Sequence, residues 1–232
     1  MSADAVILDK KWLLRAGGIS AIILGVSYIL ITGLYALGGP LPNGAEEWLK
    51  YLAGQTTAWW AILGLSVLTD FLFLPVTLAL FLALKEIDRN AMLIGAILVV
   101  MFVILDLAVT WPNYSSLITL SGNYAAATSD VQRTAFVSAA SYASAVLSSG
   151  LFAVYAILVP SLGILVIGLV MKKSAFHKVT AYSGMASGIL GIISVVGPVF
   201  IGALGGAVIL ASVLTTVWVL LLGCRLYRLG QP

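Results

Sequence analysis

The sequence predicts an all-α fold, a single bundle of six transmembrane helices that spans residues 1–232. Three observations support this prediction. Of the 232 residues, 61% are apolar and 9% are charged, and the mean hydropathy is +1.11, so too little polar surface exists to cover a soluble core. Six apolar runs are each long enough to cross a bilayer. The Lys and Arg residues lie in the turns between alternate runs.

The first apolar run, residues 13–37, follows Lys10, Lys11 and Arg15. It is longer than the apolar region of a signal peptide, which has about 7–15 residues, so we expect a retained first helix. The Gly- and Pro-rich segment 38–44 ends this helix. The expected spans are residues 13–37, 59–84, 91–111, 146–171, 179–201 and 205–226.

The second span contains Pro75, an expected kink. The third span is expected to end at Trp111, because Pro112 follows it. Aromatic residues before and at the start of the second span predict a band at the membrane interface. They are Trp48, Tyr51, Trp59 and Trp60.

Between the third and fourth spans, segment 115–144 is polar and rich in small residues. Ser129 and Gln132 have the spacing of a capping box that opens a helix. Apolar residues then follow at helical spacing, at Val131, Ala135, Ala139, Tyr142 and Val146. We therefore expect an amphipathic helix that lies on or dips into the outer interface before the fourth span.

The fourth span has a bend point at Pro160 and ends in a basic turn, whose Lys172, Lys173 and Lys178 are expected to contact anionic lipid head groups. The fifth span carries a stripe of small residues that predicts close packing on a neighbouring helix. The stripe includes Gly184, Gly188 and Gly191.

The charges orient the bundle. The N-terminus, the turn after the second span, the turn after the fourth span and the C-terminus hold ten of the twelve Lys and Arg residues, and only Lys50 and Arg133 lie on the other side. Positive residues favour the cytoplasmic side. We therefore expect a multi-pass protein of the inner (cytoplasmic) membrane, with both termini inside and segment 115–144 outside.

Two acids interrupt the apolar spans, and a charge in the centre of a bilayer costs about 2.5–3.5 kcal/mol on insertion scales. Asp70 and Asp106 lie about 14 and 15 residues from the polar turn 85–90 that joins their helices. With a rise of about 1.5 Å per residue, both are expected at nearly the same depth.

Other polar residues share the helix faces of these acids. Ser66 and Thr77 lie on the face of Asp70, and Thr110 and Asn113 lie on that of Asp106. If the two faces meet, they line a polar cleft that widens outward, with an acid pair that shares a proton and binds a small solute, a cation or a proton. Two alternatives stay open: each acid is hydrogen-bonded to a neighbouring helix as a structural link, or the acids do not face each other.

The composition excludes several classes of site. Cys224 is the single cysteine and His177 the single histidine, which excludes disulfides, Cys-based metal sites and bis-histidine haem. No metal or cofactor is predicted. The basic residues form no patch for nucleic acid, and the lipid bilayer is the expected partner. The motifs of intramembrane proteases and nucleotide-binding loops are absent, so catalysis is not expected.

Three functions therefore remain. The first is binding or passage of a small solute or proton through the outward-facing cleft. The second is a non-catalytic accessory subunit, whose glycine stripe docks a partner membrane subunit or a second copy of the chain. The third is an intramembrane enzyme that acts on lipids through the acid pair.

The chain resembles a family of small bacterial and archaeal multi-pass membrane proteins that is classified only as a domain of unknown function. The resemblance rests on the basic entry to the first helix, the acid at Asp70, the charged turn after it, the segment 130–133 before the fourth span, and the region 162–191 with its basic turn. It implies a multi-pass helical fold and no particular biochemical role.

Overall fold

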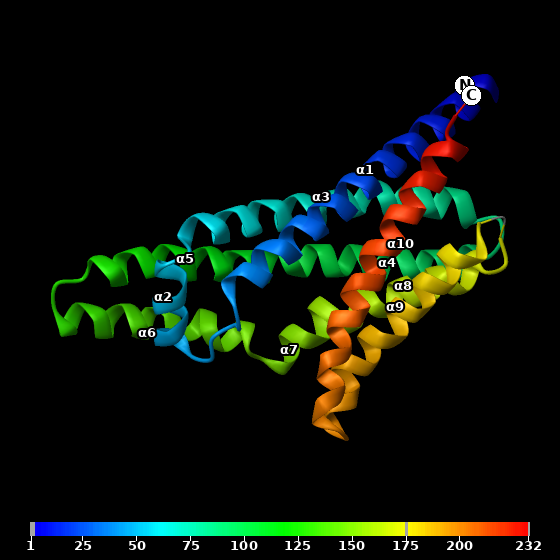
Figure 1. Cartoon of the computed structure of the whole chain (residues 1–232). Coiled ribbons are helices and arrows are strands. Elements are labelled where there is room, and N and C mark those ends of the chain that lie inside the picture. The colour runs from blue at the N-terminus through cyan, green and yellow to red at the C-terminus, as the bar shows by residue number, and fades with distance from the viewer. Residues whose placement is uncertain (1–2, 175, 232) are drawn as a thin grey trace.

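The computed structural model describes residues 3–174 and 176–231, and within them the chain is helical with no strand. Six of the described helical stretches are long and apolar enough to cross a membrane, as predicted (Figure 1). The α-helices are α1 (Ala3–Gly38), α2 (Ala45–Ala53), α3 (Thr56–Leu84), α4 (Arg89–Leu105), α5 (Trp111–Ala126), α6 (Asp130–Leu147), α7 (Gly150–Ala153), α8 (Val159–Met171), α9 (Lys178–Val196) and α10 (Ala207–Leu229). Two π-helices, η1 (Asp106–Thr110) and η2 (Val154–Leu158), and two 3-10 segments, η3 (Gly197–Val199) and η4 (Gly202–Gly206), complete the order.

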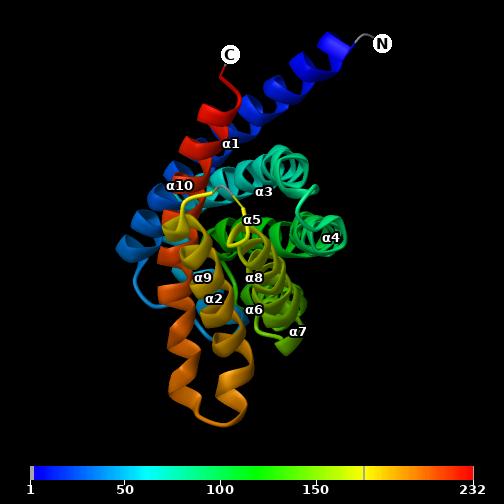
Figure 2. The same cartoon turned by 90° about the vertical axis from the view of Figure 1, so that its right-hand side faces the viewer.

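Six helices close a ring in the order α1, α3, α4, α8, α9 and α10, because each packs on the next and α10 returns to α1. The contact between α1 and α10 is especially close: a Cβ atom added at Gly18 would meet the backbone of Tyr227 and Gly223, and one added at Gly223 would meet the backbone of Gly18. Figure 2 shows these two helices crossing. Glycine is thus required here for backbone to touch backbone.

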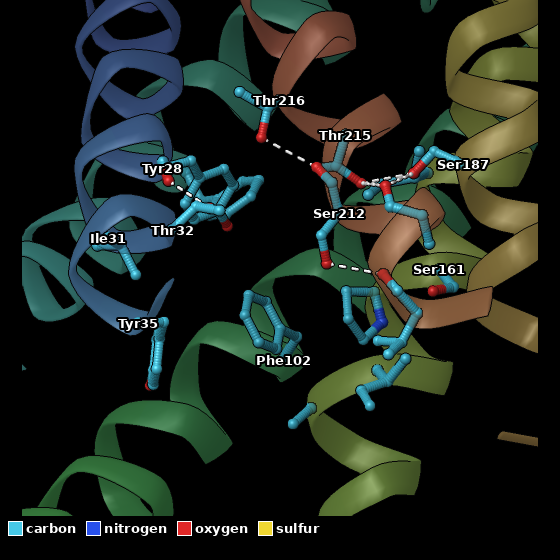
Figure 3. A pocket seen from close by; sticks show the side chains of 17 residues that line it. Tyr28, Ile31, Thr32, Tyr35, Phe102, Ser161, Ser187, Ser212, Thr215 and Thr216 are labelled. Carbon is cyan, nitrogen blue, oxygen red and sulfur yellow. Dashed lines mark hydrogen bonds between the residues drawn. The ribbon is translucent and has the colours of Figure 1, made fainter. Parts of the chain in front are cut away.

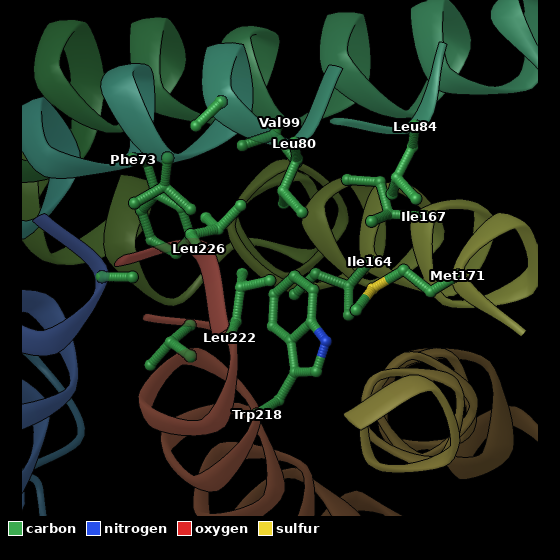
Figure 4. Close-up of a cluster of buried hydrophobic side chains, with 14 of the residues drawn as sticks. Phe73, Leu80, Leu84, Val99, Ile164, Ile167, Met171, Trp218, Leu222 and Leu226 are labelled. Carbon is green, nitrogen blue, oxygen red and sulfur yellow. The ribbon is translucent and has the colours of Figure 1, made fainter. Parts of the chain in front are cut away.

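The four basic segments lie together. Both termini, the α3–α4 turn and the α8–α9 turn gather at one end of the molecule, on the right of Figure 1. Near this end the inside of the ring is filled by apolar side chains from all six helices, including Leu80, Leu84, Ile167 and Leu226 (Figure 4). The ring is therefore closed at its basic end.

The third span is longer than expected. It continues past Trp111 and runs from Arg89 to Ala126. Proline has no N–H, and its ring clashes with the carbonyl four residues earlier in an α-helix. The turn before Pro112 widens instead into η1, where the Trp111 N–H donates to the Asp106 carbonyl five residues back. The expected helix end at Trp111 is therefore wrong.

A second π-helix has the same cause. The Val159 N–H donates to the Val154 carbonyl five residues back, directly before Pro160. The expected bend point at Pro160 is thus a widened turn. Both π-helices are followed by one residue and then a proline, so a short local sequence pattern explains each of them.

Segment 115–144 is not a single surface-lying helix. Its first part belongs to α5, and its second part forms α6, which packs against α5 and α2. Together α2, α5 and α6 form an arm at the end of the molecule opposite the basic end, on the left of Figure 1. Ser129 caps α6 by accepting from the Gln132 N–H at 3.3 Å, while Gln132 Oε1 accepts from the Thr128 N–H at 3.0 Å. The predicted helix start is therefore confirmed, with the return bond shifted by one residue.

The packed face of α6 differs from the predicted one. Val131 and Tyr142, from the expected apolar stripe, are 82% and 75% exposed. The buried face instead consists of Ala140, Ala143, Ser144 and Leu147. Small side chains let α6 approach α2 and α5 closely, so side-chain size and not hydrophobicity selects the face that packs.

Part of the aromatic band expected at the membrane interface forms a buried cluster instead. Trp48 and Trp59 are buried, and their rings meet edge to face with centroids 5.6 Å apart. Tyr35 from α1 and Tyr114 from α5 pack on Trp59 at centroid distances of 5.4 Å each. Only Trp60, among the two tryptophans at the start of α3, is exposed. These rings join α1, α2, α3 and α5 where the arm begins.

A polar contact on the surface of the arm adds to this cluster. Glu46 pairs with Lys50 at 2.7 Å and accepts a hydrogen bond from the Tyr124 hydroxyl at 3.1 Å, which ties α2 to α5. These partners, Lys50 first, lower the pKa of Glu46, and Glu46 raises the pKa of Lys50. Because both groups are exposed, solvent screens the pair and it adds little stability.

The glycine stripe of α9 packs inside the chain. A Cβ atom added at Gly184 would meet the indole of Trp218 on α10, and Cβ atoms added at Gly188 and Gly191 would meet Ser161 on α8. The stripe is therefore covered by two neighbouring helices, and it offers no free surface for a partner helix.

Replacement of Gly188 by alanine tests this packing. The added Cβ would lie 2.7 Å from the Ser161 carbonyl oxygen and 2.9 Å from the Leu165 nitrogen, both backbone atoms that cannot move aside alone. We expect Gly188→Ala to lower the free energy of unfolding by about 1–3 kcal/mol, as overpacking does. Denaturant titration of the protein in detergent measures this loss.

Gly64→Ala is the matched control, because Gly64 lies in the spanning helix α3 and has open space around the added atom. It is expected to leave stability unchanged or to raise it by up to about 1 kcal/mol through helix propensity. Equal effects of the two substitutions would contradict the packing described for α9.

Candidate functional site

The two acids lie side by side in the wall of the ring. Asp70 on α3 is 2% exposed, and Asp106, the first residue of η1, is 6% exposed. Asp70 Oδ2 accepts from the Trp111 indole Nε1 at 2.6 Å, and the charge of Asp106 acts on Asp70. The equal depth inferred by counting residues stays a prediction.

The two π-helices meet at this point. The Thr110 hydroxyl, at the end of η1, and the Tyr155 hydroxyl, in η2, are 3.1 Å apart and share a hydrogen bond. Thr110 also interacts with the carboxyl of Asp106. π-Helical turns occur frequently at functional sites because they re-aim side chains that a regular helix would not bring together. Here η1 and η2 bring Thr110, which interacts with Asp106, into contact with Tyr155.

The carboxyl groups of the acid pair are incompletely satisfied by the described residues around them. The Asp106 Oδ1 atom is buried and has no hydrogen-bond partner among the described residues. The ion pairs found in residues 3–174 and 176–231 are Lys50–Glu46, Lys85–Glu86 and Arg133–Asp130, and none includes either acid. A buried carboxylate requires a proton, a hydrogen bond or a cation nearby.

The other residues predicted for the cleft are separated from one another. Ser66 and Thr77 are buried on α3, and Ser66 accepts from Thr69 through its carbonyl. Asn113 donates to the Val109 carbonyl of its own helix at 2.7 Å. Of the four, Thr110 interacts with the carboxyl of Asp106. A cleft lined by the six predicted residues stays a prediction.

A cavity of about 320 Å³ lies elsewhere, inside the ring and on the side away from the basic end (Figure 3). Every helix of the ring contributes to its wall. Its polar lining consists of hydroxyl side chains, and none of its lining residues carries a formal charge. The hydroxyl residues are Tyr28, Thr32, Tyr35, Ser161, Ser187, Ser212, Thr215 and Thr216.

Part of this lining is held in place by hydrogen bonds. The hydroxyls of Ser187 on α9 and Thr215 on α10 lie within hydrogen-bond distance of each other and of the Ala211 carbonyl, so one of them donates to this carbonyl and the other donates to it or to the first hydroxyl. Thr216 donates to the Ser212 carbonyl one turn earlier on α10. The hydroxyl oxygens therefore keep lone pairs available as acceptors.

Aromatic rings line the cavity on the same helices that carry the acids. Phe73 and Phe102 line the cavity with centroids 5.9 Å apart, and Tyr28 packs on Phe73 at 6.3 Å. Phe73 follows Asp70 by three residues and Phe102 precedes Asp106 by four, so each acid lies about one helical turn from one of these rings. Tyr28 and Tyr35 line the cavity and also interact electrostatically with Asp106.

The hydroxyl lining of the cavity was not predicted from the sequence, although its residues follow helical spacing. Tyr28, Thr32 and Tyr35 are spaced as one face of a helix, and so are Ser212 and Thr216. Each set lies in a separate apolar span, and nothing in the sequence indicates that the first and last spans are neighbours.

The basic turn is placed as its charge pattern suggests. Lys172, Lys173 and Lys178 are exposed in the α8–α9 turn at the basic end. Lys172 Nζ lies 5.7 Å from the centroid of the Tyr182 ring, a cation–π geometry. Contact of these lysines with lipid head groups stays a prediction.

None of the protein-family models, curated proteins or solved structures compared with this chain matches it. The function therefore has to be argued from the cavity, the acid pair and the ring that encloses them.

The bond between Trp111 and Asp70 is tested by replacing the indole. Trp111→Phe keeps an aromatic ring but removes the only donor described for Asp70, so we expect the free energy of unfolding to fall by about 1.5–3 kcal/mol, the range for a hydrogen bond to a charged group. The same change in an Asp70→Asn background is expected to cost less, because the acceptor charge is gone.

Unfolding of the four proteins in detergent, followed by circular dichroism, gives the coupling energy. Trp60→Phe is the control, since Trp60 is exposed on the same helix as Asp70. A coupling energy of zero between the Trp111 and Asp70 substitutions would mean that the 2.6 Å contact contributes nothing to stability.

Proposed function

We propose that this membrane protein binds a small solute in the hydroxyl-lined cavity of the helix ring. One observation carries the proposal: the cavity is walled by all six ring helices, and its polar side chains converge on a single space (Figure 3). Binding sites for small molecules are concave, mostly apolar and supplied with a few convergent polar groups.

The lining indicates the character of the solute body. Phe73 and Phe102 offer apolar ring surfaces, while hydroxyls from α1, α8, α9 and α10 offer hydrogen bonds. Since no charged residue lines the space, the part of the solute that lies here is uncharged and carries groups that hydrogen-bond.

The orientation of the cavity follows from the charges. With the basic end in the cytoplasm, as the positive-inside tendency requires, the cavity faces outward in the cytoplasmic membrane. The apolar core between the cavity and the basic end closes the inner side. Passage of a solute would therefore require this core to open, whereas binding from outside requires no such change.

The two other functions have less support. The accessory-subunit function depended on a glycine stripe that α8 and α10 cover. A lipid-acting enzyme would need the acids at an accessible surface, and both are buried. Membership of the uncharacterised family that the sequence resembles is part of the proposal, and it adds no activity.

Thiol labelling tests the cavity and its orientation together. In a Cys224→Ser background, Ser212→Cys places a thiol in the cavity wall, and Val213→Cys places one on the adjacent exposed position of α10 outside it. Maleimides react with thiolates, which form only in contact with water. We expect a membrane-impermeant maleimide added outside to label Ser212→Cys at least tenfold faster than Val213→Cys.

Sealed vesicles of known orientation, analysed by mass spectrometry, give the two labelling rates. Equal rates for the two variants would overturn the water-accessible cavity. Labelling of Ser212→Cys only after the membrane is permeabilised would reverse the orientation.

A further inference from the structure

The acid pair and its surroundings define the charged part of the ligand. We propose that Asp70 and Asp106 bind the ammonium group of an organic cation whose uncharged body lies in the adjacent cavity. This inference rests on the proposed solute site and names the class of solute that it accepts. It is carried by three structural features: the unpartnered Asp106 oxygen, the aromatic groups around the pair, and the position of the pair beside the cavity.

The first feature is a buried acceptor without a donor. Asp106 Oδ1 has no hydrogen-bond partner among the described residues, whereas Asp70 Oδ2 already accepts from Trp111 at 2.6 Å. Two neighbouring carboxyls do not both ionise unaided, so the empty pair holds one proton.

The second feature is the chemistry of the surroundings. The groups that interact with Asp106 from each neighbouring element are Tyr28 and Tyr35 on α1, Asp70 on α3, Tyr114 on α5 and Tyr155 in η2. They are phenols and a second acid, with no basic group among them. Aromatic faces attract cations, and most strongly organic ammonium groups that are poorly hydrated. Carboxylates that alternate with aromatic rings thus select an ammonium over an anion.

The third feature is access. Tyr28 and Tyr35 line the cavity and interact with Asp106, so these two side chains are shared by the cavity and the acid pair. Both are tyrosines on one face of α1, where Tyr28 packs on Phe73 and Tyr35 packs on Trp59. An ammonium group that passes between them reaches the carboxyls while the rest of the molecule stays among the hydroxyls.

Binding has a defined proton balance. The ammonium cation supplies one positive charge, which allows both carboxyls to ionise. The proton held by the pair leaves for bulk water, and the net charge of the occupied pair stays at one negative. Neutral isosteres bring no charge and release no proton.

The test compares 2-hydroxyethylammonium with its neutral isostere ethane-1,2-diol, using the full chain in detergent. Isothermal titration in buffers of different ionisation enthalpy gives the affinity and the number of protons released. We expect the ammonium compound to bind at least tenfold more tightly than the diol and to release about one proton, in keeping with the charge argument. The affinity of the ammonium compound is expected to fall as the pH is lowered.

Substitutions test whether Asp106 is required for ammonium binding and proton release. Asp106→Asn is expected to weaken ammonium binding at least tenfold and to abolish proton release, while Asp130→Asn, which changes an exposed acid of the arm, is expected to change neither. Where Asp106→Asn does not fold, Asp106→Glu keeps the charge and is expected to keep the preference for ammonium. The comparison of the two compounds on the wild-type protein does not depend on the folding of any variant.

The outcomes separate the two proposals. Equal binding of the diol and the ammonium compound without proton release would overturn the ammonium site and leave the solute cavity standing. Sodium or potassium chloride that displaces the ammonium compound at equal concentration would also overturn it, in favour of an inorganic cation site. If neither compound binds and the Ser212→Cys thiol is unreactive, the cavity itself is refuted.

Discussion

The arrangement of this protein depends on two prolines that cannot donate a hydrogen bond. Pro112 and Pro160 lack the N–H that a regular helix requires, and in both helices the turn before the proline widens by one residue. The widened turns bring Thr110 and Tyr155 into contact and set Asp106 beside Asp70. The third span continues through its widened turn from Arg89 to Ala126.

The ring gives these local features a common interior. Helix α1 is central to it, because its glycines allow close contact with α3 on one side and with α10 on the other. The resulting interior has two halves of different chemistry. Toward the basic end it is filled with aliphatic side chains, and toward the arm it contains hydroxyl groups around open space. A single set of helices thus encloses an apolar core and a hydroxyl-lined cavity in series.

Much of the fold could be predicted from the sequence, because its physical causes are local. Hydropathy located six spans, and the clustering of Lys and Arg at alternate turns placed four segments at one end. Counting residues from the turn at 85–90 predicts one depth for the two acids, since helix rise is constant. The error at Trp111 arose because Pro112 was taken as a helix end, although a proline can also be accommodated by a wider turn.

The cavity could not be predicted, because its wall joins α1 to α10 across nearly the whole chain. The buried face of α6 was predicted wrongly for a related reason. Burial there depends on the small residues Ala140 and Ala143, which fit against α2 and α5. Both cases depend on which helices are neighbours, and no local pattern contains that information.

The length of the third span has a mechanical consequence. Its 38 residues extend about 57 Å at the usual rise, while the hydrocarbon core of a bilayer is about 30 Å thick. One continuous rod therefore connects the tip of the arm with Asp106 and with the basic end.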